Sequence, residues 1–162
     1  MFIGPCTAKK YEQKLDSVKP WIDCVITFEE LQALLDAAGF PPEEQSNQPM
    51  TDASYFGRVF GRSGGLTEAV VQSAKEQNVD FVPKAAVCSG IEQCKVALLK
   101  AKMGRLAENF IEGMACEGGC VGGPSRHRSG KNPVLAAKDR DKLLAEADDR
   151  NVSDNLSKYD LT

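Results

Sequence analysis

Apolar residues recur along this chain in short runs of β-forming residues, followed by segments with the spacing of an amphipathic helix. Met1–Ile3 is expected to form a short buried strand, and the run from Trp21 to Ile26 a second strand. The second run leads into Thr27-Phe28-Glu29-Glu30, a Thr-x-x-Glu pattern typical of a helical capping box. Apolar residues then follow at helical spacing, which predicts a helix that ends at Gly39.

The same alternation continues in the middle of the chain. Lys84–Cys88 favours a third strand and Ile91–Met103 an amphipathic helix, while Phe110-Ile111 is a short apolar element before a glycine-rich turn. The inward face of that helix is expected to carry Ile91, Cys94, Ala97 and Leu98. Strands that alternate with helices predict an α/β fold, with a roughly four-stranded, mostly parallel sheet flanked by helices.

Other segments are expected to lie outside this sheet. Phe40–Asp52 is polar and proline-rich, which predicts a loop. Towards the C-terminus the composition shifts to Lys, Asp, Ala and Leu, which predicts a surface helix over Val134–Ala147 and a polar tail over Arg150–Thr162. We therefore expect one lobe over residues 1–133, and a C-terminal helix and tail over residues 134–162.

The composition limits the classes of protein to which this chain can belong. A chain of 162 residues, 42% hydrophobic and 27% charged, suits one folded domain or two very small ones. Its net charge of −3 argues against nucleic-acid binding through bulk positive charge. No apolar run approaches the roughly 20 residues of a membrane span. The N-terminus has no pattern of a secretion signal, so we expect a cytoplasmic location.

The six cysteines, at positions 6, 24, 88, 94, 116 and 120, are the first chemical clue. Three disulfides are one alternative, but the lack of an export signal favours reduced thiols, and with them metal ligation or redox chemistry. Cys24, Cys88 and Cys94 fall inside strand or helix patterns and are expected to be small buried apolar residues. The single histidine, His127, lies between two arginines and favours a solvated basic turn, with pairing to an anionic cofactor as the alternative.

Pro5-Cys6-Thr7-Ala8-Lys9-Lys10-Tyr11-Glu12 is the first segment that could carry chemistry. Cys6 follows a predicted strand, and Lys9 comes three residues later. A nearby ammonium group stabilises the thiolate that binds metals or attacks electrophiles. Glu12 could orient Lys9 through a salt bridge. A half-buried cysteine before an ordinary charged helix is the alternative, and these residues alone leave it open.

The second segment is glycine-rich and runs from Gly61 to Glu68. Glycines before a helix can cradle phosphate groups. The Lys-Ser/Thr pair of a Walker motif is absent, since Leu66-Thr67 stands in its place, and the dinucleotide fingerprint fails as well. Tight backbone packing around something bulky is therefore the preferred interpretation over a nucleotide site.

The third segment, from Phe110 to Pro124, carries the strongest signal. Cys116 and Cys120 are separated by three residues, two of them glycine, in a C-x-G-G-C turn that differs from the usual zinc spacing. Glycine exposes backbone N–H groups, which can tune a cluster held by thiolates. The five glycines of this segment also allow a large cofactor to approach. A disulfide or a glycine-rich surface loop is the alternative.

Together these segments resemble the C-terminal part of the catalytic domain of iron-only (FeFe) hydrogenases. Pro5–Glu12 is similar to the family's second signature, Pro-Cys followed by K-x-x-E, and Phe110–Cys120 to its third, F-x-E-x-M-A-C-x-G-G-C. Phe60–Ala69 and Thr27–Leu31 are also similar, so that the resemblance covers about residues 1–124. It implies one lobe of that catalytic domain.

The resemblance implies a ligand set for the family's H-cluster. Cys6 and Cys116 would ligate a 4Fe-4S cluster. Cys120 would bridge that cluster to a di-iron subsite that carries CO and cyanide. The family's first signature, T-S-C-x-P-x-W, is absent, so the chain offers three matching thiols where a 4Fe-4S cluster takes four.

The resemblance also implies roles around the cofactor. Lys9 would hydrogen-bond a cyanide ligand and pair with Glu12, and Met114 would pack over the di-iron subsite. Three further residues would line the cofactor: Pro5, Gly118 and Gly119.

The implied function is that of part of a hydrogenase. We expect a fragment of an iron-only hydrogenase-like protein that oxidises dihydrogen, reduces protons or senses dihydrogen, and that is inactive in isolation. Its implied partners are the missing N-terminal half with the first cysteine motif and an electron carrier such as ferredoxin. The alternative is a non-catalytic iron–sulfur cluster-binding or assembly protein of the same superfamily.

Overall fold

The computed structural model describes residues 1–40, 54–126 and 151–156. They fall into two compact units: residues 1–40 with 121–126, and residues 54–120 with 151–156. The boundary expected between residues 133 and 134 lies outside the described residues. So do His127, the helix expected over Val134–Ala147 and nearly all of the loop expected over Phe40–Asp52.

The first unit is built on two short parallel strands, β1 (Phe2–Ile3) and β2 (Val25–Ile26). The backbone N–H of Phe2 donates to Cys24 over 2.9 Å, and that of Gly4 donates to Ile26 over 3.1 Å. Because parallel strands cannot be joined by a tight turn, the chain crosses over between them, and the crossover contains helix α1 (Lys9–Glu12).

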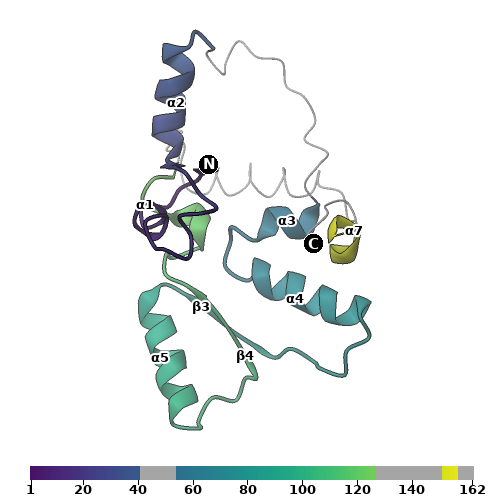
Figure 1. The fold of residues 1–162 in the computed structure, drawn as a ribbon. Coiled ribbons are helices and arrows are strands. Elements are labelled where there is room, and N and C mark those ends of the chain that lie inside the picture. Colours follow the sequence, from purple (N-terminus) through teal and green to yellow (C-terminus); the bar gives the residue numbers. More distant parts are fainter. Residues whose placement is uncertain (41–53, 127–150, 157–162) are drawn as a thin grey trace. The chain divides into compact units, whose positions relative to one another are not determined.

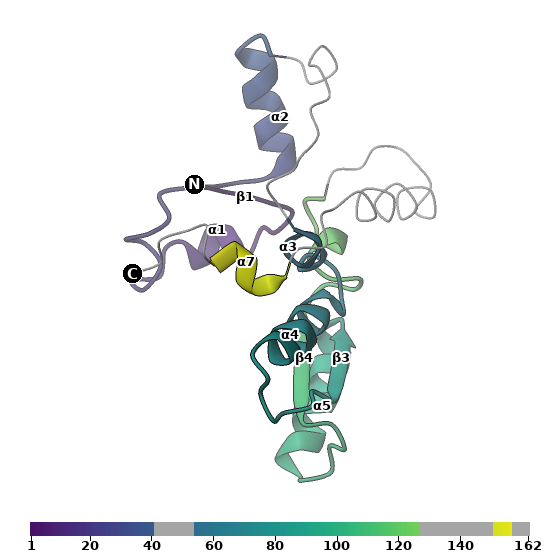
Figure 2. The same ribbon diagram turned by 90° about the vertical axis from the view of Figure 1, so that its right-hand side faces the viewer.

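Helix α2 (Phe28–Ala37) confirms the capping box. The Glu30 N–H donates to the Thr27 hydroxyl over 3.3 Å, and the Thr27 N–H donates to the Glu30 carboxylate over 2.8 Å. The helix ends before Gly39, whose φ of +72° suits glycine. No residue of α2 is buried, and Figure 2 shows the helix extending away from α1 and β1.

The second unit contains the parallel pair β3 (Ala85–Ser89) and β4 (Phe110–Met114), connected through helix α5 (Ile91–Lys102). Its other helices are α3 (Tyr55–Val59), α4 (Gly65–Glu76) and α7 (Val152–Leu156). Helix α5 packs against both strands, and Figure 1 shows α5 on one side of the pair and α4 on the other. This is a β-α-β unit with helical cover.

The α/β class is confirmed, but the arrangement of strands differs from the expected one. Instead of one four-stranded sheet, the described residues form two sheets of two parallel strands each. The two strands of each pair are joined by a crossover connection that stays within one unit, so each unit forms its own sheet.

Two expected strands are shorter or less buried than their β-forming residues predict. Ile3 is 41% exposed, because β1 belongs to a two-stranded sheet with little cover. The strand expected from Trp21 is confined to Val25–Ile26, since Trp21 and Ile22 both donate backbone hydrogen bonds to Val18 in a turn. Trp21 is therefore 81% exposed.

The inward face of α5 is also narrower than expected. Ala97 is buried at 6% exposure and Cys94 is half-buried, whereas Ile91 and Leu98 are 55% and 60% exposed. Small side chains face the strands because the helix lies close to them. The C-terminal tail is not wholly irregular, since its residues 152–156 form α7.

Candidate functional site

The Cys116–Cys120 loop begins two residues after β4 ends. Gly118 and Gly119 have φ values of +80° and +92°, a region that residues with a side chain rarely adopt. The Gly119 N–H donates to the Cys116 carbonyl over 3.0 Å, and Cys120 starts a short 3-10 turn. The two glycines of the C-x-G-G-C motif are thus required by the backbone that spaces the cysteines.

This loop packs directly against the glycine-rich segment before α4. The Ser63 N–H donates to the Gly118 carbonyl over 3.1 Å. A Cβ atom on Gly119 would lie 2.6 Å from the Ser63 nitrogen and 2.7 Å from the Gly61 oxygen, closer than real Cβ atoms come. The tight packing expected of the glycine-rich segment is present, but its neighbour is the backbone of the cysteine loop and not a bulky group.

The glycine-rich segment is itself held in place by side chains. Arg62 forms an ion pair with Glu68 over 2.6 Å, and the Tyr55 hydroxyl donates to the same carboxylate over 2.8 Å. Desolvation opposes the charge of Arg62, but its bonds to Tyr55 and Glu68 outweigh this and raise the pKa of its guanidinium. The surface against which the cysteine loop packs is therefore braced from within its own unit.

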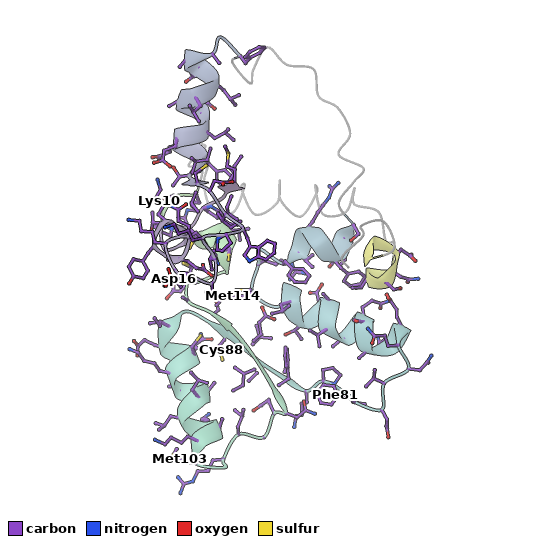
Figure 3. All side chains as sticks on the ribbon, in the orientation of Figure 1. Lys10, Asp16, Phe81, Cys88, Met103 and Met114 are labelled. Atoms are coloured by element: carbon purple, nitrogen blue, oxygen red, sulfur yellow. The ribbon has the colours of Figure 1, made fainter. Side chains whose placement is uncertain are left out.

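The opposite side of the loop is tied to the end of β3. The Gly118 N–H donates to the Ser89 hydroxyl over 2.8 Å, and the Gly90 N–H donates to the Met114 carbonyl over 2.8 Å. Because β3 and β4 are parallel, their carboxyl ends meet at one edge, which is where open α/β sheets commonly bind ligands. Figure 3 shows Met114 at this end of β4.

Glu112 is the functional candidate that the sequence reasoning missed. It is 1% exposed, and its carboxylate accepts hydrogen bonds from the Gly64 N–H over 2.8 Å, the Thr67 N–H over 2.9 Å and the Thr67 hydroxyl over 2.5 Å. Gly64 is the N-cap of α4 and Thr67 its third residue, so the carboxylate also meets the positive end of the helix dipole. These N–H groups are committed to Glu112, which argues against a phosphate site at this helix.

A signal for Glu112 is present in the sequence. Phe110, Glu112 and Met114 alternate along a strand, and residues two apart lie on one face of a sheet. A carboxylate in the middle of such a run is expensive to bury unless donors meet it. From the sequence, Phe110-Ile111 is only a short apolar element, which ends before Glu112 and so does not include this alternation.

All six cysteines lie in the described residues as free thiols. Cys6 and Cys116 are half-buried and Cys120 is exposed. Cys88 is buried, as predicted, and Figure 3 shows it between the strand pair and α5. Burial, and then the neighbouring Cys94, raise the pKa of its thiol, so Cys88 favours the neutral form that does not bind metals. Cys24 and Cys94 are only half-buried, which corrects the expectation for them.

In the first unit, Lys9 and Glu12 form the expected ion pair, one helical turn after Cys6. Their side chains are 42% and 45% exposed, which leaves the Lys9 ammonium accessible to a ligand. The carbonyl of Pro5 accepts the N–H of Ser125 over 3.1 Å. The segment after Cys120 therefore returns to the residue that precedes Cys6.

The thiols and backbone N–H groups of these segments are the chemical groups that usually hold an iron–sulfur cluster. Thiolates are the usual ligands of such clusters, and glycine-rich backbone offers them N–H donors. The Ser63 hydroxyl, beside the cysteine loop, is buried with no hydrogen-bond partner among the described residues, and so could donate to an acceptor. Within those residues, no three His, Cys, Asp or Glu side chains gather into a ready-made metal site.

Comparison with known proteins gives a family match. Residues 1–124 match the model of the iron only hydrogenase large subunit, C-terminal domain. Over 87% of its length the chain is 29% identical to iron hydrogenase 1 of Clostridium pasteurianum. Over 82% it is 31% identical to the periplasmic [Fe] hydrogenase large subunit of Nitratidesulfovibrio vulgaris. Over 81% it is 25% identical to a probable cytosolic Fe-S cluster assembly factor of Aedes aegypti.

The matched regions are only part of these relatives. They cover 29%, 38% and 36% of the three proteins respectively, so the chain spans about a third of their length. Among the described helices, none combines the length and the apolar character that crossing a bilayer requires.

Proposed function

The chain belongs to the family of C-terminal domains of iron-only hydrogenase large subunits, and from this premise we propose that it supplies part of the pocket of an iron–sulfur active-site cofactor. The observation that carries the proposal is that Cys6, Cys116 and Cys120 are free thiols within the matched residues, the first two half-buried and the third exposed. Cys6 and Cys116 would ligate a 4Fe-4S cluster, and Cys120 would join it to a di-iron subsite.

When bound, the cofactor would supply the redox chemistry and the iron at which dihydrogen is cleaved or formed. The residues of this chain would bind and orient it. The Lys9 ammonium, held by Glu12, would donate a hydrogen bond to an anionic cyanide ligand. Met114 would cover the di-iron subsite, and Pro5, Gly118 and Gly119 would line the pocket and exclude water.

Iron uptake by the purified chain tests the ligand set. The chain is reconstituted with iron and sulfide, and bound iron is measured together with the visible absorbance of thiolate-bound iron. Cys6→Ser, Cys116→Ser and Cys120→Ser should each lower iron uptake at least several-fold. Cys24→Ser and Cys94→Ser are matched controls, since both residues are half-buried cysteines, one in each unit, outside the proposed set. Equal iron uptake by all five variants would overturn the proposal.

The proposed activity of the full assembly is reversible dihydrogen oxidation, or dihydrogen sensing, with an electron carrier such as ferredoxin as the redox partner. We expect this chain alone to be inactive, because three thiols leave the cluster one ligand short. A polypeptide with the first cysteine motif would supply the fourth ligand. After cofactor maturation, gas chromatography should detect turnover only when that polypeptide is present. Turnover by the chain alone would contradict this expectation.

A second function is favoured by the similarity to the assembly factor: cluster binding without hydrogen chemistry. The two functions differ in the ligands of the iron. Infrared bands from CO and cyanide after maturation favour the hydrogenase, and a 4Fe-4S cluster without these bands favours the assembly protein.

We propose a cytoplasmic location, because six reduced cysteines are typical of a reducing compartment. One of the relatives is named periplasmic.

A further inference from the structure

We propose that Glu112 is a positioning residue for the Cys116–Cys120 loop: its buried carboxylate locks the start of α4, and with it the backbone on which this loop rests. The proposal rests on the proposed function only in naming these cysteines as ligands. Glu112 would act through the backbone and would not touch the cofactor.

Two neighbouring N–H groups connect Glu112 to the loop. The Gly64 N–H donates to Glu112, and the preceding N–H, that of Ser63, donates to the Gly118 carbonyl. One short stretch of backbone therefore holds both the strand that leads to Cys116 and the turn between the two cysteines. Loss of the Glu112 bonds would release Gly64 and loosen its neighbour Ser63.

The cysteine loop and the glycine-rich segment are packed so closely that neither backbone can move without the other. Gly119 is buried and lies against the backbone of Gly61–Ser63, so these two backbones cannot approach each other further. Only three residues separate Glu112 from Cys116. A shift of the glycine-rich segment would therefore reach the cysteine loop instead of being absorbed between them.

The contacts of Glu112 suit this role better than proton transfer. Two of its three donors are backbone amides and the third is the Thr67 hydroxyl, none of which releases a proton at ordinary pH. Its side chain is almost inaccessible to water. The carboxylate is thus an acceptor with fixed partners.

The test is the reactivity of the thiols in the metal-free chain. Iodoacetamide labelling, followed residue by residue by mass spectrometry, is compared in the wild type and in Glu112→Gln. Glutamine keeps the shape of glutamate but presents an amide group to the Thr67 donors. We expect labelling of Cys116 to accelerate about tenfold, since a buried donor left without its partner favours local opening by roughly that factor. Hydrogen exchange at residues 61–67 should accelerate in parallel.

Cys88 provides the internal control, because it is buried in the same unit under α5. A positioning role predicts faster labelling of Cys116 with labelling of Cys88 unchanged. Unchanged labelling of Cys116, or an equal acceleration at both thiols, would overturn the proposal. Glu92→Gln is the matched control variant, since it alters an exposed carboxylate of the same unit.

Thr67 variants keep the proposal testable if Glu112→Gln fails to fold. Thr67→Ser retains both donors and should behave as the wild type, whereas Thr67→Val removes the hydroxyl donor and should accelerate Cys116 labelling several-fold. Equal labelling in Thr67→Ser and Thr67→Val would contradict the role of this contact.

Iron uptake separates this proposal from the proposed function. If Cys116→Ser and Cys120→Ser leave iron uptake unchanged, the ligand assignment fails, while the labelling result still decides the role of Glu112. If iron binds through these cysteines but Cys116 labelling is the same in Glu112→Gln, the positioning role alone fails.

Discussion

Helices α2 and α4 both begin with a carboxylate that accepts the N–H of the N-cap residue, but the two carboxylates come from different places in the chain. In α2 it belongs to Glu30, three residues after the N-cap Thr27. In α4 the N-cap is Gly64, which has no side chain, and the acceptor is Glu112, 48 residues away in the sequence. Both carboxylates accept an N–H at a helix start, one from within the same helix and one from a distant strand.

The difference shows what each cap can control. The cap of α2 satisfies its own helix, which has no buried residue, so its loss should stay within that helix. The cap of α4 joins a helix to the strand that leads into the cysteine loop, so its loss should be felt at the loop. A long-range cap costs more to form, because two distant segments must be ordered together, and in return it couples them.

The largest expected effect is that of removing the long-range acceptor. Glu112→Ala leaves three buried donors without a partner, and we expect it to lower the free energy of unfolding of the second unit by about 4 kcal/mol. Native-state hydrogen exchange at residues 110–114 measures this directly. A decrease in the free energy of unfolding below about 1 kcal/mol, the usual effect of losing an exposed cap, would show that the cap of α4 is worth no more than the local cap of α2.

The next effect comes from a pair of adjacent glycines. Gly118 and Gly119 both have positive φ, but only Gly119 would place a Cβ against other backbone. Gly118→Ala should therefore cost about 1 kcal/mol from backbone strain, and Gly119→Ala about 3 kcal/mol, because steric overlap is added. Hydrogen exchange at residues 61–67 measures both, and equal losses would show that the loop does not rest on this backbone.

Loss of the local cap should be smaller and confined to α2. Thr27→Ala removes the hydroxyl that accepts the Glu30 N–H, and should cost about 1 kcal/mol. Exchange should accelerate at residues 28–31, with labelling of Cys116 unchanged. Thr27→Ser, which keeps the hydroxyl, is the control. A change at Cys116 would contradict the local character of this cap.

The same distinction explains what could be predicted from the sequence. The capping box, the helix end at Gly39, and the strand and helix that became β3 and α5 depend on neighbouring residues, and the sequence predicts them. The cysteine loop was recognised from its motif, but its supports at Ser63 and Ser89 were not, since they meet it only in the fold. Trp21 shows the converse, because its β propensity yields to a local turn that leaves it exposed.

Glu76 offers the mildest test, since it forms a third cap, between α4 and α7. Its carboxylate accepts the N–H groups of Val152 over 2.9 Å and Ser153 over 3.0 Å. Desolvation raises the pKa of Glu76, but the hydrogen bonds, from Ser153 first, outweigh it and lower the pKa from 4.5 to about 2. A lowered pKa in the folded state means that the contact contributes stability above pH 4.5 and loses it as the pH falls towards 2.

The amide resonances of Val152 and Ser153 should therefore titrate near pH 2 and stay constant above pH 4.5. In Glu76→Gln this transition should disappear, while the labelling rate of Cys116 stays as in the wild type because the cap at Glu112 is intact. A midpoint near pH 4.5 would show that these bonds do not favour the charged carboxylate. The hydrogen bonds of Glu76 would then join α4 to α7 without an electrostatic contribution from the charged carboxylate.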